Sequence, residues 1–238
     1  MRAAWHLRVN SLVLLWLLAA AALAFSHRSV AMSGWLLVHL LLLGAISTAI
    51  LIWSAHFAEA VRRRPLGGGH RAQAVRLGLH TLGAVAVVVG VLLGSTWVVG
   101  GGALLVATSA LWHAVAIARL GRGALGVRLG FTSWYFVASA AVLPVGVSLG
   151  VLLARADAAG DEAPRVYVAH VAVMMLGWVG LTVVGTMVTL WPTMLRVQLA
   201  DDAAIAARHG LPVLGCGLAL VLLGAWTGIV MLSGAGLL

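Results

Sequence analysis

The chain has 238 residues, of which 63% are apolar and only 9% are charged. Soluble domains carry about 25% charged residues, so this composition excludes a sizeable water-soluble domain. The net charge of +9 comes from arginines in short loops between apolar runs rather than from one basic face, and it therefore indicates membrane topology and not a nucleic-acid partner.

Seven apolar runs follow one another along the chain, each near or above the ~20 residues that span a hydrocarbon core as a helix. They lie at about residues 10–26, 32–61, 72–95, 96–118, 129–154, 166–195 and 211–235. The first run has a basic start but no clear small-residue cleavage site, so we interpret it as a retained helix and not a signal peptide. The predicted fold class is an all-α polytopic transmembrane helical bundle of about seven helices, forming a single domain over residues 1–238.

The third and fourth runs are joined by little more than Gly94, Ser95 and Thr96, so these two helices must be antiparallel neighbours. Three glycine pairs have the small-xxx-small spacing that lets helices approach closely, and we expect them to serve packing: Gly90/Gly94, Gly146/Gly150 and Gly224/Gly228. Among the tryptophans, Trp35, Trp97 and Trp191 are expected in the interfacial belts, whereas Trp178 and Trp226 are expected in the core.

The arginines orient the bundle, because cytoplasmic loops carry an excess of positive charge. Twelve of the fifteen fall on one side, including Arg62–Arg64, Arg76, Arg122 and Arg128. The other side has three arginines and the acidic residues Asp157, Asp161 and Glu162. We therefore expect a cytoplasmic N-terminus, an external C-terminus and a multi-pass location in the inner (cytoplasmic) membrane.

Five histidines lie within the predicted spans, and they are the unusual feature of the sequence: His39, His56, His80, His113 and His170. An ionisable residue inside a membrane is expensive and is normally turned inward and given a partner or a ligand. A single such histidine is most often a hydrogen-bonded packing residue. Five on four helices instead favour a binding site.

Counting along the helices predicts two layers of histidines. His39 and His170 fall near the outer face, whereas His56, His80 and His113 fall in an inner layer. At ~1.5 Å rise per residue, His39 and His56 are about 25 Å apart along one helix and cannot serve one compact site. The sequence therefore predicts one outer and one inner site.

Neutral imidazole binds haem iron, copper and zinc, and two histidines on facing helices commonly hold a haem from both sides. We expect one or two b haems, with His39 and His170 as the outer pair and His80 with His113 or His56 as the inner pair. Copper is the alternative cofactor. Cys216 is the only cysteine, which excludes an internal disulfide, a c-type haem attachment and a thiolate cluster.

Glu59 is the only carboxylate close to the inner histidines, and three roles are open for it. The first role is to orient a ligand imidazole, the second is to accept a proton from a quinol, and the third is to pair with Arg62 and Arg63 at the membrane interface. The chain has no GxxxxGK[ST], HExxH or GxSxG motif, and its spans lack the charged pairs of ion-coupled carriers. Redox chemistry remains, and the sequence leaves open whether the chain itself is an enzyme.

Two segments carry a family resemblance: HLLLLGAISTAILIWSAHFAEAVRR from His39 to Arg63, and AHVAVMMLGWVGLTVVGTMVTLWPTMLR from Ala169 to Arg196. They resemble a membrane module found in GC-rich bacteria ahead of copper-oxidase or copper nitrite-reductase domains. More distantly, the pattern is similar to haem-copper oxidase subunit I and to NnrS-type haem/copper membrane proteins. The resemblance implies a b-haem or copper module that exchanges electrons with an outer-face copper domain, with His39, His56 and His170 as the matching histidines.

The leading hypothesis is a haem b-binding transmembrane electron-transfer protein that links a quinol or similar donor to an extracytoplasmic copper or haem partner. That partner would be a copper-oxidase or nitrite-reductase-like domain, and oligomerisation in the bilayer stays open. The alternative is a copper or haem handling or assembly protein without redox turnover. A third interpretation is a structural subunit whose histidines are satisfied by each other and by hydroxyls such as those of Thr48, Ser109 and Thr182.

Overall fold

The computed structural model describes residues 2–121, 130–155, 162–198 and 200–237, and this part of the chain is helical apart from short turns and contains no β-strand. Seven of its helices are long and apolar enough to cross a bilayer. Helices suit that environment because every backbone N–H and C=O finds its partner within the segment. The prediction of an all-α polytopic bundle is confirmed, and the chain is a multi-pass membrane protein.

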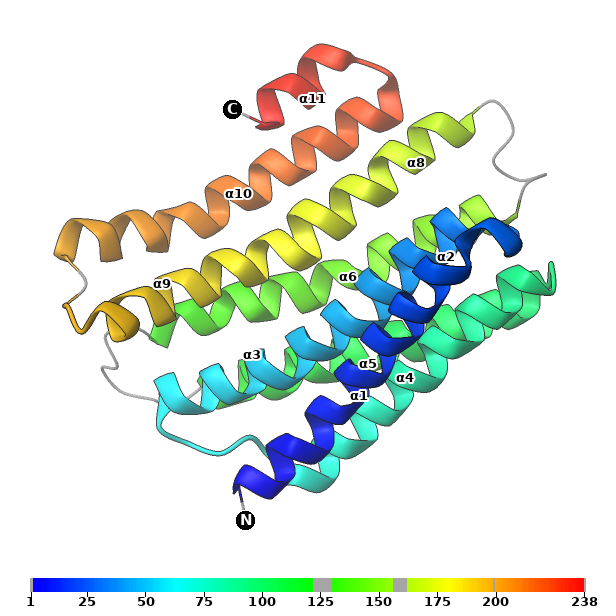
Figure 1. Cartoon of the computed structure of the whole chain (residues 1–238). Helices are drawn as coiled ribbons and strands as arrows, with labels where there is room; N and C mark the ends of the chain where they lie inside the picture. Colours follow the sequence, from blue (N-terminus) through cyan, green and yellow to red (C-terminus); the bar gives the residue numbers. More distant parts are fainter. Residues whose placement is uncertain (1, 122–129, 156–161, 199, 238) are drawn as a thin grey trace. The chain divides into compact units, whose positions relative to one another are not determined.

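The elements run in the following order (Figure 1). They are α1 (Arg2–Ser26), η1 (His27–Ser29), α2 (Ser33–His39), η2 (Leu40–Ile46), α3 (Ser47–Arg62), α4 (Gly69–Leu92), α5 (Thr96–Gly121), η3 (Gly130–Thr132), α6 (Ser133–Ala154), α8 (Ala163–Ala172), η5 (Val173–Gly180), α9 (Leu181–Leu195), α10 (Asp201–Thr227) and α11 (Val230–Leu237). Short η1 and η3 are 3₁₀-helices, whereas η2 and η5 are π-helices.

The described residues form two compact units, and the boundary between them passes through α3 and α5. The first unit comprises Met1–Trp53 and Gly68–Ser109, and the second comprises Ser54–Gly67 and Ala110–Leu238. In the first unit α1 packs against α2 and η2. Gly44 of η2 makes this approach possible, because a β-carbon there would lie 2.5 Å from the indole of Trp16.

Helix α4 and the first half of α5 form the antiparallel hairpin that the short link predicts. The two helices touch at glycines: a β-carbon on Gly83 would lie 2.7 Å from the carbonyl oxygen of Gly102, and one on Gly90 would lie 2.7 Å from the backbone nitrogen of Val99. Gly94 adopts φ +63° and forms the turn itself. The packing role expected for the Gly90/Gly94 pair is therefore confirmed for Gly90 and wrong for Gly94.

In the second unit α6 packs along α8, η5 and α9, and α10 lies beside α8 and η5. Hydroxyls join these helices: Thr182 Oγ1 donates to Ser139 Oγ at 2.9 Å, and Tyr135 Oη donates to the carbonyl of Ala207 at 2.6 Å. Trp178 of η5 is 1% exposed and lies at the centre of the unit, as expected. The same expectation is wrong for Trp226, which is 65% exposed because it lies on the outer face of α10.

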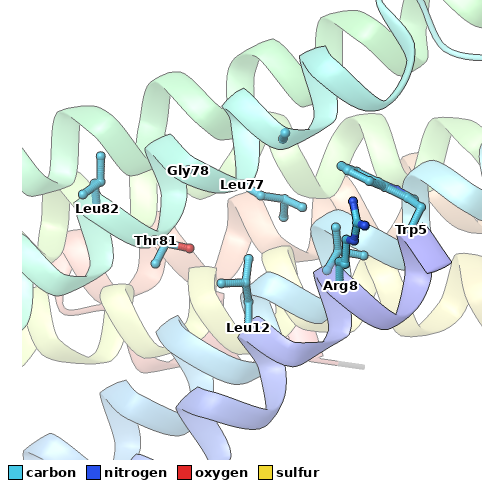
Figure 2. A pocket seen from close by; sticks show the side chains of 9 residues that line it. Trp5, Arg8, Leu12, Leu77, Gly78, Thr81 and Leu82 are labelled. Carbon is cyan, nitrogen blue, oxygen red and sulfur yellow. The ribbon is translucent and has the colours of Figure 1, made fainter.

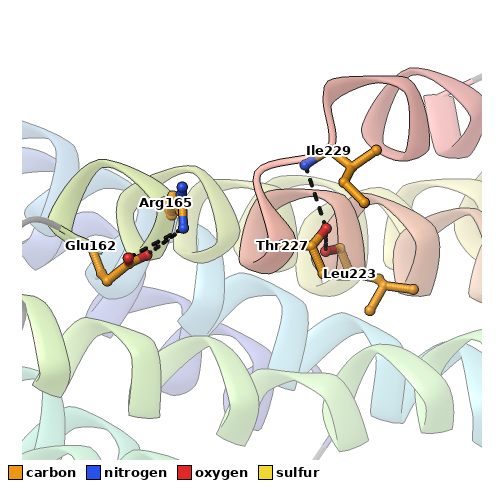
Figure 3. A network of polar contacts seen from close by, with 5 residues as sticks. All are labelled: Glu162, Arg165, Leu223, Thr227 and Ile229. Atoms are coloured by element: carbon orange, nitrogen blue, oxygen red, sulfur yellow. Dashed lines mark hydrogen bonds and ion pairs between the residues drawn. The ribbon is translucent and has the colours of Figure 1, made fainter.

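The seventh span differs from the predicted run at 211–235. Helix α10 begins ten residues earlier at Asp201 and ends at Thr227, because Gly228 adopts φ +75° and stops the helix. Thr227 Oγ1 caps this end by donating to the carbonyl of Leu223 and accepting from the Ile229 N–H (Figure 3). Helix α11 then folds back along α10, as Figure 1 shows. The packing role expected for the Gly224/Gly228 pair is therefore confirmed for Gly224, where a β-carbon would overlap the backbone of Ser233 in α11, whereas Gly228 forms the turn.

Beside this turn Arg165 forms an ion pair with Glu162 at 2.9 Å at the start of α8 (Figure 3). A β-carbon on Gly228 would lie 3.0 Å from the Arg165 guanidinium, so the glycine gives the arginine its room. Four other charged residues of the predicted topology lie outside the described residues: Arg122, Arg128, Asp157 and Asp161. The predicted orientation of the two chain ends stays a prediction.

One arginine is placed differently from the expected loops. Arg76 lies in the third turn of α4 and is 1% exposed, so it belongs to the interior of the first unit. The carbonyl of Arg76 accepts a hydrogen bond from Ser109 Oγ of α5 at 2.8 Å. Burying an arginine in an apolar helix costs free energy, so Arg76 is not simply one of the loop arginines that set the membrane orientation.

We predict that Gly102→Ala destabilises the protein by about 1–3 kcal/mol, because the added methyl group would lie 2.7 Å from backbone atoms of α4 that cannot move aside cheaply. Gly100→Ala on the same helix is the matched control, since its β-carbon would meet no atom within 4 Å. Thermal unfolding of both variants in one detergent checks this. Equal unfolding midpoints for the two variants would contradict the glycine contact.

Candidate functional site

The two longest spans, Ser33–Arg62 and Ala163–Pro192, each contain one π-helix next to a histidine. His39 directly precedes η2, and His170 lies three residues before η5. π-Helical turns are rare and occur frequently at functional sites, where they change the direction of neighbouring side chains. The hydropathy pattern of the sequence gives no sign of either segment. Their recurrence beside the two predicted outer histidines makes these positions the candidate site.

His39 is held by the residue one turn before it. Its Nδ1 lies 2.8 Å from the carbonyl oxygen of Trp35, and its ring stacks on the Trp35 indole with centroids 3.9 Å apart and an interplanar angle of 22°. A carbonyl oxygen only accepts, so Nδ1 carries the proton and the lone pair of the neutral ring is on Nε2. Trp35, expected only as an interfacial residue, therefore orients the imidazole.

His170 reaches the same tautomer through a different helix. Its Nδ1 donates to the carbonyl oxygen of Gly146 in α6 at 2.8 Å. The ring lies against Gly150, where a β-carbon would be 3.1 Å from Cε1. The predicted packing role of the Gly146/Gly150 pair is confirmed. The group that packs against Gly150 is the imidazole ring of His170. His170 is half-buried, as is His39.

His39 and His170 therefore share one local chemistry. In each, a main-chain carbonyl fixes Nδ1–H and leaves Nε2 as the basic nitrogen, which is the arrangement that orients ligand histidines in metal and haem proteins. His39 belongs to the first unit and His170 to the second. Their pairing across one cofactor stays a prediction.

His80 is completely buried in the middle of α4. Its Nε2 donates to the carbonyl of Leu43 within η2 at 3.0 Å, while Ser47 Oγ donates to the neighbouring carbonyl of Leu42 at 2.8 Å. Nδ1 of His80 has no hydrogen-bond partner among the residues that the structure describes. His80 therefore contacts a residue four positions beyond His39, and its place in an inner layer stays a prediction.

The other two inner histidines lie in the second unit. His113 Nε2 is 2.8 Å from Ser54 Oγ, and both side chains are buried. His56 is half-buried, and its ring meets the edge of the Phe57 ring. In the parts of the chain described here, no group of three or more His, Cys, Asp or Glu side chains is placed to hold a metal ion. The inner pair stays a prediction.

Glu59 stabilises the turn that follows α3. Its Oε1 accepts the backbone N–H of Leu66 at 2.8 Å, while the Arg62 guanidinium donates to Ser133 Oγ at 2.9 Å. Of the hydroxyls named as partners for histidines, Ser109 donates to the Arg76 carbonyl and Thr182 donates to Ser139 and to the Trp178 carbonyl. Ser54, which sequence reasoning missed, is the hydroxyl that meets an imidazole.

We predict that Ser54→Ala destabilises the protein by about 1–3 kcal/mol, because it removes the hydroxyl that meets a buried imidazole nitrogen of His113. Ser148→Ala is the matched control. Its exposed hydroxyl bonds only the carbonyl one turn earlier in α6, so little should change. Unfolding free energies of the two variants, measured side by side in detergent, decide the matter: equal losses would mean that the His113–Ser54 contact contributes nothing specific.

Comparisons with protein-family models, with curated proteins and with solved structures find no match to this chain. The family resemblance of the two histidine-bearing segments accordingly stays an expectation, and the functional argument depends on the geometry of the site.

Proposed function

We propose that the chain is a haem b-binding electron-transfer protein of the inner membrane that links a quinol or similar donor to an extracytoplasmic copper or haem partner. One observation carries this proposal. His39 and His170, in the two longest spans, both lie beside a π-helix and both have Nδ1 held at 2.8 Å by a main-chain carbonyl. The sequences around His39 and His170 are unrelated, yet in both residues Nδ1 is the protonated ring nitrogen.

The donor set fits a b-type haem. Such a haem takes its axial ligands from neutral imidazoles, and a fixed Nδ1–H increases the basicity of Nε2 and sets the orientation of the ring. The carbonyls of Trp35 and Gly146 would perform this task here, and the absence of a side chain at Gly150 leaves space for the His170 ring. When bound, the haem supplies a one-electron carrier inside the low-dielectric bilayer.

The inner histidines differ from the outer pair in their burial and in their hydrogen bonds. His80 and His113 are fully buried, and each has one ring nitrogen engaged with Leu43 or Ser54. A second haem on these residues, with His56 as the alternative ligand, would have to use the other nitrogen of His80 or break an existing contact. The outer pair is therefore the better-supported half of the two-layer hypothesis.

The test is a dithionite-reduced minus oxidised spectrum of the detergent-purified protein, produced with haem supplied, together with a pyridine haemochrome count. We expect a b-type spectrum with one or two haems per chain. His39→Ala and His170→Ala should each lower the haem content by about half or more, since a haem that loses an axial ligand is held far less well.

His27→Ala and His209→Ala are matched controls, because both histidines are exposed and lie outside the two π-helical regions. They should keep the full haem content. A well-folded preparation without haem would overturn the proposal, as would outer-histidine variants that retain as much haem as these controls.

Copper handling without redox turnover is the second candidate, and one contact favours it. A β-carbon on Gly146 would lie 2.5 Å from Met174 Sδ, and the carbonyl of Gly146 accepts from His170 Nδ1, so a thioether and an imidazole meet at one glycine. Soft sulfur together with imidazole suits Cu(I). Stoichiometric copper without haem, lost in both Met174→Leu and His170→Ala, would select this candidate.

A further inference from the structure

A groove of about 340 Å³ runs between α1 and α4 in the first unit (Figure 2). Its lining is mostly apolar, with one arginine and one hydroxyl. The residues that matter for its chemistry are Trp5, Arg8, Leu12, Leu77, Thr81 and Leu82. Gly78 also lines it, and a β-carbon there would meet no atom within 4 Å, so the space beside this glycine is open.

The groove changes from polar to apolar along its length. At one end Trp5 Nε1 donates to Gln73 Oε1 at 3.1 Å, and the Trp5 indole stacks on His70 with centroids 4.4 Å apart. These contacts place the N-terminal ends of α1 and α4 side by side, so the positive ends of two helix dipoles lie at the polar end. Arg8 follows one turn further, and Leu12 and Leu82 continue the lining toward the apolar end.

The first unit has positive charge and no carboxylate of its own to balance it. Met1–Trp53 and Gly68–Ser109 contain five arginines and not one aspartate or glutamate. No carboxylate of this unit can therefore neutralise Arg8. Thr81 Oγ1, which points into the groove in Figure 2, is a buried hydroxyl without a hydrogen-bond partner among the described residues. An arginine and an unsatisfied hydroxyl in one apolar groove favour an amphipathic, anionic occupant.

We propose that this groove binds one anionic phospholipid. The phosphate group is held by Arg8 near the two helix N-termini, and an acyl chain lies against Leu12, Leu77 and Leu82. Both helices are membrane spans, so the polar end of the groove faces the headgroup region and the apolar end enters the hydrocarbon. Basic pockets between transmembrane helices recognise anionic headgroups by this combination of charge and depth. The site does not depend on the haem proposal.

The experiment uses the full chain in detergent, with phosphatidylglycerol and phosphatidylcholine added separately. Binding is followed by native mass spectrometry, and stabilisation by the thermal unfolding midpoint. We expect one tightly retained phosphatidylglycerol per chain and a larger upward shift of the midpoint with phosphatidylglycerol than with phosphatidylcholine. Inorganic phosphate alone should give no shift, because it lacks the acyl chain that the groove accommodates.

Two variants test the two halves of the site. Arg8→Gln should weaken phosphatidylglycerol binding by about fivefold, the factor expected for one arginine near an anionic lipid surface. Gly78→Leu should abolish binding, because a β-carbon at this position meets no atom within 4 Å and the rest of the leucine side chain would occupy the groove. Arg28→Gln, near the other end of the first span, and Gly100→Leu, another open glycine position, are the matched controls and should bind as the unmodified chain does.

Equal binding of phosphatidylglycerol and phosphatidylcholine would overturn the proposal, and so would Arg8→Gln and Gly78→Leu variants that bind like their controls. Stabilisation by inorganic phosphate equal to that by phosphatidylglycerol would show an anion site and not a lipid site, and would also overturn it. Because Gly78→Leu replaces a helical glycine with a stronger helix former, loss of lipid in a variant that is at least as stable cannot be attributed to unfolding.

Discussion

Polar groups inside a hydrocarbon layer have no water to bind, so each must find its hydrogen bond within the protein. This requirement makes the described chain helical almost throughout, and it also decides how the side chains behave. Hydroxyls bond to carbonyls of their own helix or to polar groups of a neighbouring one, as Thr182 does to the carbonyl of Trp178 and to the hydroxyl of Ser139. Histidines obey the same rule, and the way each ring is satisfied distinguishes candidate ligands from packing residues.

The two π-helices lie beside the candidate ligands, and the need to satisfy polar groups within the protein is seen clearly in η2. In η2 the carbonyls of Leu42 and Leu43 are bonded by side chains, Ser47 and His80. His80 thereby becomes part of what holds η2 in place, whereas His39 and His170 have Nδ1 fixed and Nε2 as their basic nitrogen. A structural role for the buried histidine and a binding role for the outer two are therefore compatible in one protein.

The seven spans could be predicted from the sequence because length and hydropathy alone decide which segments cross a bilayer. Helix ends were harder, since one glycine in the left-handed region, Gly228, ended a run whose hydropathy continued. The site was predictable only in residue type. Which nitrogen of His170 is held depends on a carbonyl from α6, and no hydropathy pattern reports a contact between Gly146 and His170 or the presence of a π-helix.

The central claim is that carbonyl oxygens hold His39 and His170 as neutral imidazoles protonated on Nδ1, with Nε2 as the basic nitrogen. Nitrogen-15 NMR of histidine-labelled protein, prepared without haem and assigned with the two alanine variants, measures this state directly. The account predicts Nδ1-protonated neutral rings for both residues at neutral pH. Rings protonated on Nε2, or charged imidazolium rings, would contradict it and leave the matched setting of the two histidines without functional meaning.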